Sequence, residues 1–189
     1  MNVLAIYGSP RKNGNTDILL DEFLKGVSAV APDASIERIY IRDLKIEPCK
    51  EYNVCLKTGN CIIKDDMTAF YDKLINAERI ALAAPVFFYS LPAQTKALVD
   101  RCQALWARKY ILKQTIKNTG RKGFFISAGG TKGENLFTGT ILTVKYFFKA
   151  INVDYAGELV YNKVDTNGAI REHPTALKDA FEAGNKFGT

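Results

Sequence analysis

The 189-residue sequence has little that would suggest a membrane or secreted protein. Its longest apolar runs fall well short of the roughly 18 residues that a membrane span needs, so no membrane partner is expected. It opens with no cationic and apolar leader, and four cysteines are too few for a disulfide framework in a chain of this length. We therefore expect a soluble protein of the reducing cytoplasm.

The sequence also lacks a long basic cluster, although its formal net charge is +6 and its pI is about 9.1. The Lys and Arg residues are scattered among acids, apart from the short pairs Arg108-Lys109 and Arg121-Lys122. Nucleic-acid-binding domains concentrate basic side chains on one face or stripe. The composition favours attraction of small anionic cofactors or substrates, and no nucleic-acid partner is expected.

Short apolar runs alternate along the chain with amphipathic runs of helical period. The apolar runs predict strands at 2–7, 35–41, 79–84, 122–128 and 153–161. Alternating strands and helices indicate a doubly wound parallel sheet covered by helices on both faces. We predict one α/β, flavodoxin-like domain over residues 1–189, with a five-stranded sheet of order 2-1-3-4-5 and ligands at the carboxyl ends of the strands.

The segment Gly8-Ser9-Pro10-Arg11-Lys12-Asn13-Gly14-Asn15-Thr16 joins the first strand to the first helix. A strand, polar loop and helix in this order direct free backbone N–H groups and a positive helix end toward one point, which suits an anion. The segment matches neither the triphosphate loop nor the dinucleotide turn. An ordinary capped turn is rarely this long and polar. The segment therefore indicates a monophosphate site that uses the Ser9 and Thr16 hydroxyls, amide groups near Asn13 to Thr16, and Arg11.

Two further loops are predicted at the same edge of the sheet. Residues 84–94 follow the third strand and carry Pro85 and the Phe87-Phe88-Tyr89 cluster, and residues 127–135 follow the fourth strand and are rich in glycine. Each loop alone could be an aromatic segment packed in the core or a simple glycine turn. Beside the phosphate loop, the two predict a site for a flat aromatic ligand.

With these loops, at residues 8–16, 84–96 and 127–130, the chain resembles the flavodoxin-like NAD(P)H-dependent FMN reductase and iron-sulfur flavoprotein family over nearly its whole length. The resemblance implies FMN as cofactor, NAD(P)H as reductant, and a homodimer or homotetramer in which a neighbouring subunit helps cover the flavin. It implies phosphate contacts at Ser9, Arg11, Asn13, Asn15 and Thr16, and ring contacts at Pro85, Val86, Phe87, Phe88, Ala128, Gly129 and Gly130.

A cysteine-containing loop insertion is predicted at about 42–65. Iron-sulfur flavoproteins of this family carry four cysteines there, and four thiolates can hold a cubane cluster. This chain keeps Cys49, Cys55 and Cys61 but has Tyr52 in the second position, and a phenol is a poor cluster ligand. Loss of the cluster is favoured. A three-cysteine cluster, a zinc site or a Cys55–Cys61 thiol pair are the alternatives.

The sequence thus predicts an FMN-dependent oxidoreductase that transfers electrons from NAD(P)H to a flavin, a quinone or another small acceptor. One alternative is an FMN-containing electron-transfer protein that accepts electrons from a ferredoxin-like partner, with an incomplete iron-sulfur site. Another is a redox-responsive binding protein that uses the thiols of the 49–61 loop, which requires a thiol of low pKa. No catalytic acid or base is identified, because the flavin carries the chemistry and the protein positions it.

Overall fold

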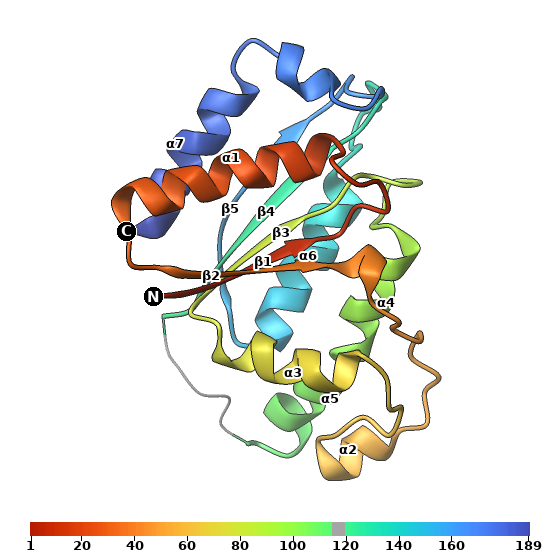
Figure 1. The fold of residues 1–189 in the computed structure, drawn as a ribbon. Helices are drawn as coiled ribbons and strands as arrows, with labels where there is room; N and C mark the ends of the chain where they lie inside the picture. The colour runs from red at the N-terminus through yellow and green to blue at the C-terminus, as the bar shows by residue number, and fades with distance from the viewer. Residues whose placement is uncertain (115–119) are drawn as a thin grey trace.

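A computed structural model describes residues 1–114 and 120–189 (Figure 1). Its centre is a five-stranded parallel sheet of order β2-β1-β3-β4-β5, which confirms the predicted flavodoxin-like α/β fold. Each predicted strand agrees with the observed one to within one residue at either end. The strands are β1 (Asn2–Tyr7), β2 (Ser35–Tyr40), β3 (Arg79–Ala83), β4 (Lys122–Ala128) and β5 (Asp154–Tyr161).

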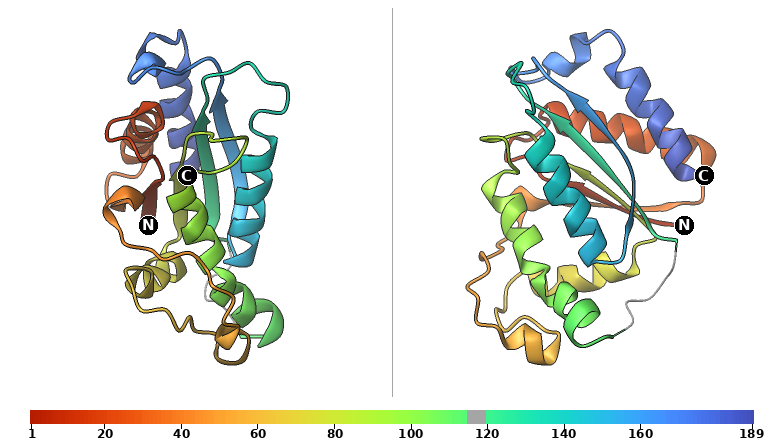
Figure 2. Two further views of the ribbon diagram at one scale, coloured as in Figure 1. Left: turned by 90° about the vertical axis from the view of Figure 1, so that its right-hand side faces the viewer. Right: turned by 180° about the vertical axis from the view of Figure 1, so that it is seen from behind.

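Helices cover both faces of the sheet, as Figure 2 shows. The side chains of β1 alternate between the two cores: Val3, Ala5 and Tyr7 face one, and Leu4 and Ile6 face the other. The first core lies under α1 (Asn15–Val30) and α7 (Ala176–Gly188). The second lies under α3 (Met67–Asn76), α4 (Ala93–Arg101), α5 (Gln103–Trp106) and α6 (Thr138–Ala150).

Four short helices complete the described chain: η1 (Ile41–Asp43), α2 (Val54–Thr58), the π-helical η2 (Ala107–Ile111) and η3 (Ala169–Glu172). Two of them, η1 and α2, lie in the predicted loop insertion between β2 and α3. Across residues 1–114 and 120–189, no helix combines the length and the apolar character that crossing a membrane would require.

Helices α1 and α7 pack against each other through glycines. A Cβ atom added to Gly184 would overlap the carbonyl oxygen of Phe23, and one added to Gly26 would overlap that of Phe181. The two backbones therefore approach more closely than side chains would allow. This contact joins the helix that follows the first strand to the last helix of the chain (Figure 1).

A buried arginine forms hydrogen bonds that connect several elements at the end of the sheet where the strands begin. Arg121 is 2% exposed, and its Nε and one terminal nitrogen donate to the carbonyls of Ala77 and Ile151 at 2.7 Å each. Its other terminal nitrogen donates to the carbonyl of Leu74. Arg121 thereby connects the ends of α3 and α6 to the start of β4, at the opposite end of the strands from the predicted ligand edge.

Candidate functional site

The three predicted loops meet around one cleft at the carboxyl edge of the sheet. Because β1, β3 and β4 are neighbours in the sheet, the loops that follow them are neighbours too. The cleft has a volume of about 90 Å³. Its lining residues are Ser9, Pro10, Arg11, Gly14, Asn15, Thr16, Pro85, Val86, Phe87, Ala128, Gly129, Gly130, Val164, Asp165 and Asn167. The predicted cofactor residues are all among them except Asn13 and Phe88.

At one end of the cleft, a buried hydroxyl lacks a bonding partner. Thr16 is 1% exposed, and its Oγ1 has no hydrogen-bond partner within the described structure. The Ser9 Oγ accepts the Arg11 N–H at 3.1 Å, so its own proton can still be donated. Helix α1 starts at Asn15, and the first N–H groups of a helix have no intrahelical acceptor. These donors fit the oxygens of a phosphate group.

Glycines allow close packing in the loops around the cleft. A Cβ atom added to Gly8 would lie 2.6 Å from Thr95 Oγ1, and one added to Gly130 would lie 2.8 Å from Asp165 Oδ1. A Cβ on Gly14 would lie 3.3 Å from Ser9 Oγ. Both contact distances at Gly8 and Gly130 are shorter than real Cβ atoms show, so these positions admit only glycine without rearrangement.

The two predicted asparagines make contacts within the protein. Asn13 has a positive φ of 55° and lies outside the cleft, and its N–H donates to Asp17 Oδ2 at 3.1 Å. Asn15 lines the cleft, but its Nδ2 donates to Thr166 O at 2.9 Å and its Oδ1 accepts the Ile170 N–H at 3.3 Å. The Asn15 amide thus ties α1 to the loop after β5, and the second hydrogen of its Nδ2 and its backbone N–H are left to donate to a ligand.

At the other end of the cleft, hydrogen bonds continue the sheet beyond its strands. The Val86 N–H donates to Ala128 O at 3.1 Å, the Gly129 N–H to Tyr161 O at 3.0 Å, and the Val164 N–H to Gly129 O at 3.0 Å. The last bond brings residues 164–167 into the cleft wall. The sequence analysis missed this fourth wall, although the predicted position of β5 beside β4 would have placed the following loop there.

The aromatic loop contains a tight turn that exposes Phe88 to solvent. Phe87 and Ser90 exchange N–H···O bonds of 2.9 Å, and Phe88 and Tyr89 between them have φ values of 49° and 59°. Phe88 is fully exposed and does not line the cleft, so its contact with the ligand stays a prediction. The Tyr89 hydroxyl packs directly against Gly133, where a Cβ atom would overlap it. The strained turn therefore presents Phe88 to solvent.

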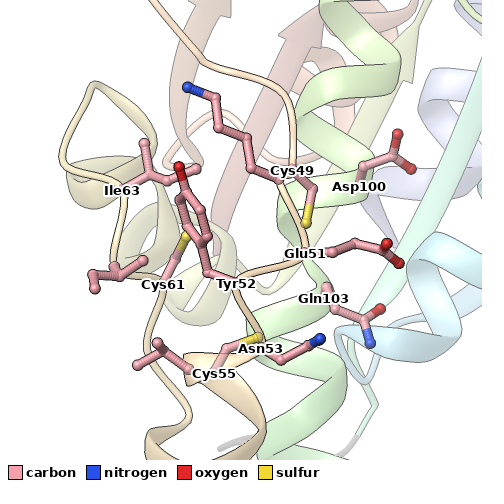
Figure 3. Close-up of a pocket in the computed structure, with 12 residues that line it drawn as sticks. Cys49, Glu51, Tyr52, Asn53, Cys55, Cys61, Ile63, Asp100 and Gln103 are labelled. Atoms are coloured by element: carbon pink, nitrogen blue, oxygen red, sulfur yellow. The ribbon is translucent and has the colours of Figure 1, made fainter.

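A second, larger cavity of about 350 Å³ lies beside the cysteine loop, and Figure 3 shows the Tyr52 ring standing among Cys49, Cys55 and Cys61. Burial, followed by the neighbouring thiols of Cys61 and Cys49, raises the pKa of the Cys55 thiol. A raised pKa makes a thiol less reactive at neutral pH, which counts against Cys55 as a redox-responsive group.

The cysteine loop is held in place by arginines. Arg101 is buried and pairs with Asp65 through two bonds, of 2.7 and 3.1 Å, and its guanidinium also donates to Glu47 O at 2.9 Å and Ile63 O at 3.1 Å. Arg108 donates to Gly59 O at 2.7 Å. Side chains of α4 and η2 thus hold this loop at its backbone carbonyls and at Asp65.

The residues of this loop do not fit a cluster held by four thiolates. In the part of the chain that the structure describes, no three His, Cys, Asp or Glu side chains are arranged to hold a metal ion. A four-thiolate cluster would need a fourth cysteine, and Tyr52 occupies that position in the sequence.

Comparison with known proteins connects the cleft to a family. Residues 1–144 match the family described as NADPH-dependent FMN reductase. The chain is 36% identical over 143 residues to an iron-sulfur flavoprotein of Archaeoglobus fulgidus, a match that covers 75% of this chain and 69% of that protein. It is 34% identical over 134 residues to an iron-sulfur flavoprotein of Methanosarcina thermophila, with 70% and 65% covered. The matches span about two thirds of the length of these relatives.

Solved structures share the fold at low identity. The NAD(P)H:quinone oxidoreductase of Methanothermobacter marburgensis superposes with a TM-score of 0.73 at 17% identity, with 98% of each chain covered. An FMN-dependent NADH-azoreductase of Bacillus anthracis, solved with FMN, superposes with a TM-score of 0.71 at 14% identity over all of both chains. These structural matches show the fold, whereas the sequence matches show the family. This chain belongs to the NADPH-dependent FMN reductase family, whose cofactor is FMN and whose reductant is NADPH.

Proposed function

We propose that this protein binds FMN in the cleft at the carboxyl edge of the sheet and transfers electrons from NAD(P)H to a free flavin, a quinone or another small acceptor. The observation that carries the proposal is the meeting of three loops around a cleft in which the buried Thr16 hydroxyl has no partner. The family assignment supports the cofactor. The acceptor class is suggested by the names of the similarly folded quinone oxidoreductase and azoreductase.

In this proposal the phosphate lies at the start of α1. The hydroxyls of Thr16 and Ser9 donate to its oxygens, the first N–H groups of α1 donate as well, and the exposed Arg11 guanidinium offsets its charge. The Thr16 hydroxyl, which lacks a partner in the protein, would gain an acceptor. Phosphate binding therefore satisfies groups that the fold leaves unsatisfied.

The ring system lies against Pro85, Val86 and Phe87, with its polar edge toward the loop that follows β4. Because the Gly129 N–H already donates to Tyr161 O, the Gly130 N–H is the next backbone donor along this loop that can face the ring. Bound FMN would supply the hydride acceptor and pass electrons onward. Of the residues that line the cleft, Arg11 and Asp165 are the ones that ionise, and neither is placed as a buried acid or base.

Electrons and protons balance without a protein acid. In one turnover NAD(P)H loses a hydride and becomes NAD(P)⁺, and a quinone acceptor takes up two electrons and two protons, one of them from solvent. The protein's contribution is to orient the reactants and to leave the cleft open on one side for nicotinamide and acceptor in turn.

Acceptor-dependent oxidation of NADH and NADPH by the FMN-loaded protein tests the proposal. We expect oxidation in the presence of FMN, riboflavin or a soluble quinone, and its loss when FMN is removed from the protein and the acceptor is a quinone. Re-addition of FMN should restore it. Absence of oxidation with every flavin and quinone would overturn the proposed activity.

A second candidate is an electron-transfer protein that accepts from a ferredoxin-like partner, and two observations favour it. The formal net charge of +6 suits an acidic partner, and the strained turn presents Phe88 to solvent beside the cleft. Rapid-mixing measurements distinguish the candidates, because this function requires flavin reduction by reduced ferredoxin and none by NAD(P)H.

We propose further that Tyr52 leaves the loop without an iron-sulfur cluster. After anaerobic incubation with iron and sulfide, we expect the natural chain to take up no cluster, whereas Tyr52→Cys should take up about four iron atoms per chain. Tyr52→Ser is the matched control and should resemble the natural chain. Four iron atoms in the natural chain would contradict the proposal, and none in Tyr52→Cys would show that Tyr52 is not the reason.

The homodimer or homotetramer that the resemblance implies is also a proposal. Phe87 is 46% exposed and Phe88 fully exposed at the rim of the cleft, and a second subunit could cover both. Light scattering on the eluted protein tests this expectation, and a monomer at micromolar concentration would contradict it.

A further inference from the structure

Arg42, which lies outside the phosphate loop (residues 8–16), contacts the backbone of this loop. Arg42 belongs to η1, directly after β2, and β2 lies beside β1, from which the loop emerges. One terminal nitrogen of Arg42 lies 2.9 Å from Asp17 Oδ2, 3.3 Å from Ser9 O and 3.4 Å from Arg11 O. Its guanidinium also lies over the Tyr40 ring, 4.5 Å from the ring centroid. Arg42 thus contacts the loop at two carbonyls and at the first turn of α1.

These contacts set the direction of the loop's backbone dipoles. The carbonyls of Ser9 and Arg11 point to the guanidinium, and carbonyl oxygens that faced a phosphate would instead repel it. The same Asp17 Oδ2 accepts the N–H of Asn13, whose positive φ of 55° is uncommon for a residue with a side chain. The Arg42–Asp17 pair therefore holds residues 9–13 from both sides.

The Arg42–Asp17 ion pair also neutralises a negative charge next to the proposed phosphate position. Asp17 is 2% exposed and follows Thr16 directly, so its carboxylate lies in the same first turn of α1 that would receive the phosphate. Burial raises the pKa of Asp17 to about 6, and Arg42 and the Asn13 N–H work in the opposite direction. Without a cation beside it, this carboxylate would repel a phosphate dianion.

We propose that Arg42, acting with Asp17, is a positioning residue for the phosphate of FMN. It holds the loop in the conformation that receives the phosphate and neutralises the carboxylate beside it, while the phosphate itself is bound by the loop and by α1. The inference rests on the proposed function, because it requires that FMN places its phosphate at this loop.

Binding of FMN and of riboflavin, which has no phosphate, tests the role. Dissociation constants are measured by quenching of flavin fluorescence on titration with flavin-free protein. For Arg42→Gln we expect FMN affinity to fall roughly 10- to 100-fold, as for the loss of hydrogen bonds to a charged group, and riboflavin affinity to stay within about twofold. Arg42→Lys keeps the charge but loses the planar guanidinium. Its FMN affinity should therefore lie between those of the natural chain and Arg42→Gln.

The matched control is Arg38→Gln, which removes an exposed arginine from the same strand region and should leave both affinities unchanged. Adding Asp17→Asn to Arg42→Gln should recover part of the FMN affinity, because it removes the carboxylate that Arg42 no longer neutralises. Simple additivity of the two changes would show that the residues do not act as a pair.

The outcomes separate the inference from the proposed function. Failure of the natural chain to bind FMN overturns the proposed function. Unchanged FMN affinity in Arg42→Gln overturns only the role of Arg42. Equal losses for FMN and riboflavin also overturn it, because they would mean that Arg42 supports the whole cleft, and a melting curve of each variant identifies any that has unfolded.

Discussion

A single buried atom without a hydrogen-bond partner marks the end of the cleft at which we propose that the phosphate binds. A buried polar group in a folded protein nearly always has a partner, and leaving one without costs roughly 1–3 kcal/mol. The Thr16 hydroxyl is buried and unpartnered in the described structure, whereas the Thr95 hydroxyl nearby donates to Gly8 O at 2.7 Å. The contrast between two threonines at one loop indicates which of them is kept for a ligand.

Replacement of Thr16 by valine should therefore have opposite effects on folding and on binding. We expect the free energy of unfolding of the flavin-free protein to stay the same or rise by up to about 1 kcal/mol, because an unsatisfied hydroxyl is removed. FMN affinity should fall roughly 10-fold or more, with riboflavin affinity unchanged. Urea unfolding and flavin titration measure the two quantities.

The control for Thr16 is Thr143→Val in α6, because the Thr143 hydroxyl donates to Gly139 O at 2.8 Å away from the phosphate loop. It should leave FMN affinity unchanged. A Thr16→Val protein that binds FMN as tightly as the natural chain would remove this hydroxyl from the site.

The ionisation of Asp65 makes the cysteine loop sensitive to pH. Burial disfavours the Asp65 carboxylate, but bonds from Arg101 and from the N–H groups of Glu47 and Met67 outweigh it and lower the pKa of Asp65 below its usual 3.8. Because the folded pKa is the lower one, the stabilisation is complete above the unfolded pKa. It is lost as the pH falls through the folded pKa.

Asp65→Asn should therefore lower the free energy of unfolding by about 3 kcal/mol at pH 7, since it leaves the buried Arg101 without its counter-charge. The difference from the natural chain should shrink as the pH falls through the lowered pKa of Asp65. Urea unfolding at a series of pH values measures it. Asp100→Asn is the control. It breaks the exposed Lys96–Asp100 pair on α4, the helix that carries Arg101, and should change the free energy of unfolding by less than about 0.5 kcal/mol.

At the scale of whole elements, hydrophobic period was enough to predict the sheet, but not the way its helices meet. Apart from Arg79, Lys122 and Ser127, the runs at 79–84 and 122–128 carry no polar side chain, because central parallel strands are covered on both faces, and β3 and β4 are found there. The approach of α1 to α7 depends on single glycines instead, and a glycine within a helix produces no periodic signal.

Gly184→Ala should therefore destabilise the protein, although alanine is usually preferred to glycine within a helix. In an exposed helix interior this change would stabilise by about 1 kcal/mol, but here the new methyl group would overlap the Phe23 carbonyl in α1. We expect a loss of stability of about 2 kcal/mol, as for overpacking of a core. Thermal or urea unfolding decides it, and Glu182→Ala on the exposed face of α7 is the control. A more stable Gly184→Ala protein would show that the helices can separate without cost.

At the scale of the whole molecule, the proposed cofactor cleft and the buried Arg121 lie at opposite ends of the sheet. The proposed cofactor cleft is lined by the loops that follow β1, β3 and β4, and the buried Arg121 directly precedes β4. Arg121→Met should lower the free energy of unfolding by several kcal/mol, because it leaves three carbonyls without their donor.

The Arg121→Met protein that remains folded at low temperature should bind FMN with unchanged affinity, because the substitution lies at the far end of the sheet. Melting temperature and flavin titration on the same preparation test both statements. A selective loss of FMN affinity in folded protein would show that the two ends are coupled.

The sequence by itself determined where the strands lie, because hydrophobic period depends on neighbouring residues. The crossover rules for parallel strands then predicted the strand order and the meeting of three loops at one edge. The sequence also pointed to the Thr16 and Ser9 hydroxyls, since a polar segment between strand and helix has a local meaning. Only the tertiary structure decided that Arg42 supports the phosphate loop and that Phe88 faces solvent. Such contacts join residues far apart in the chain, or depend on the backbone angles of one turn, and neither leaves a periodic pattern in the sequence.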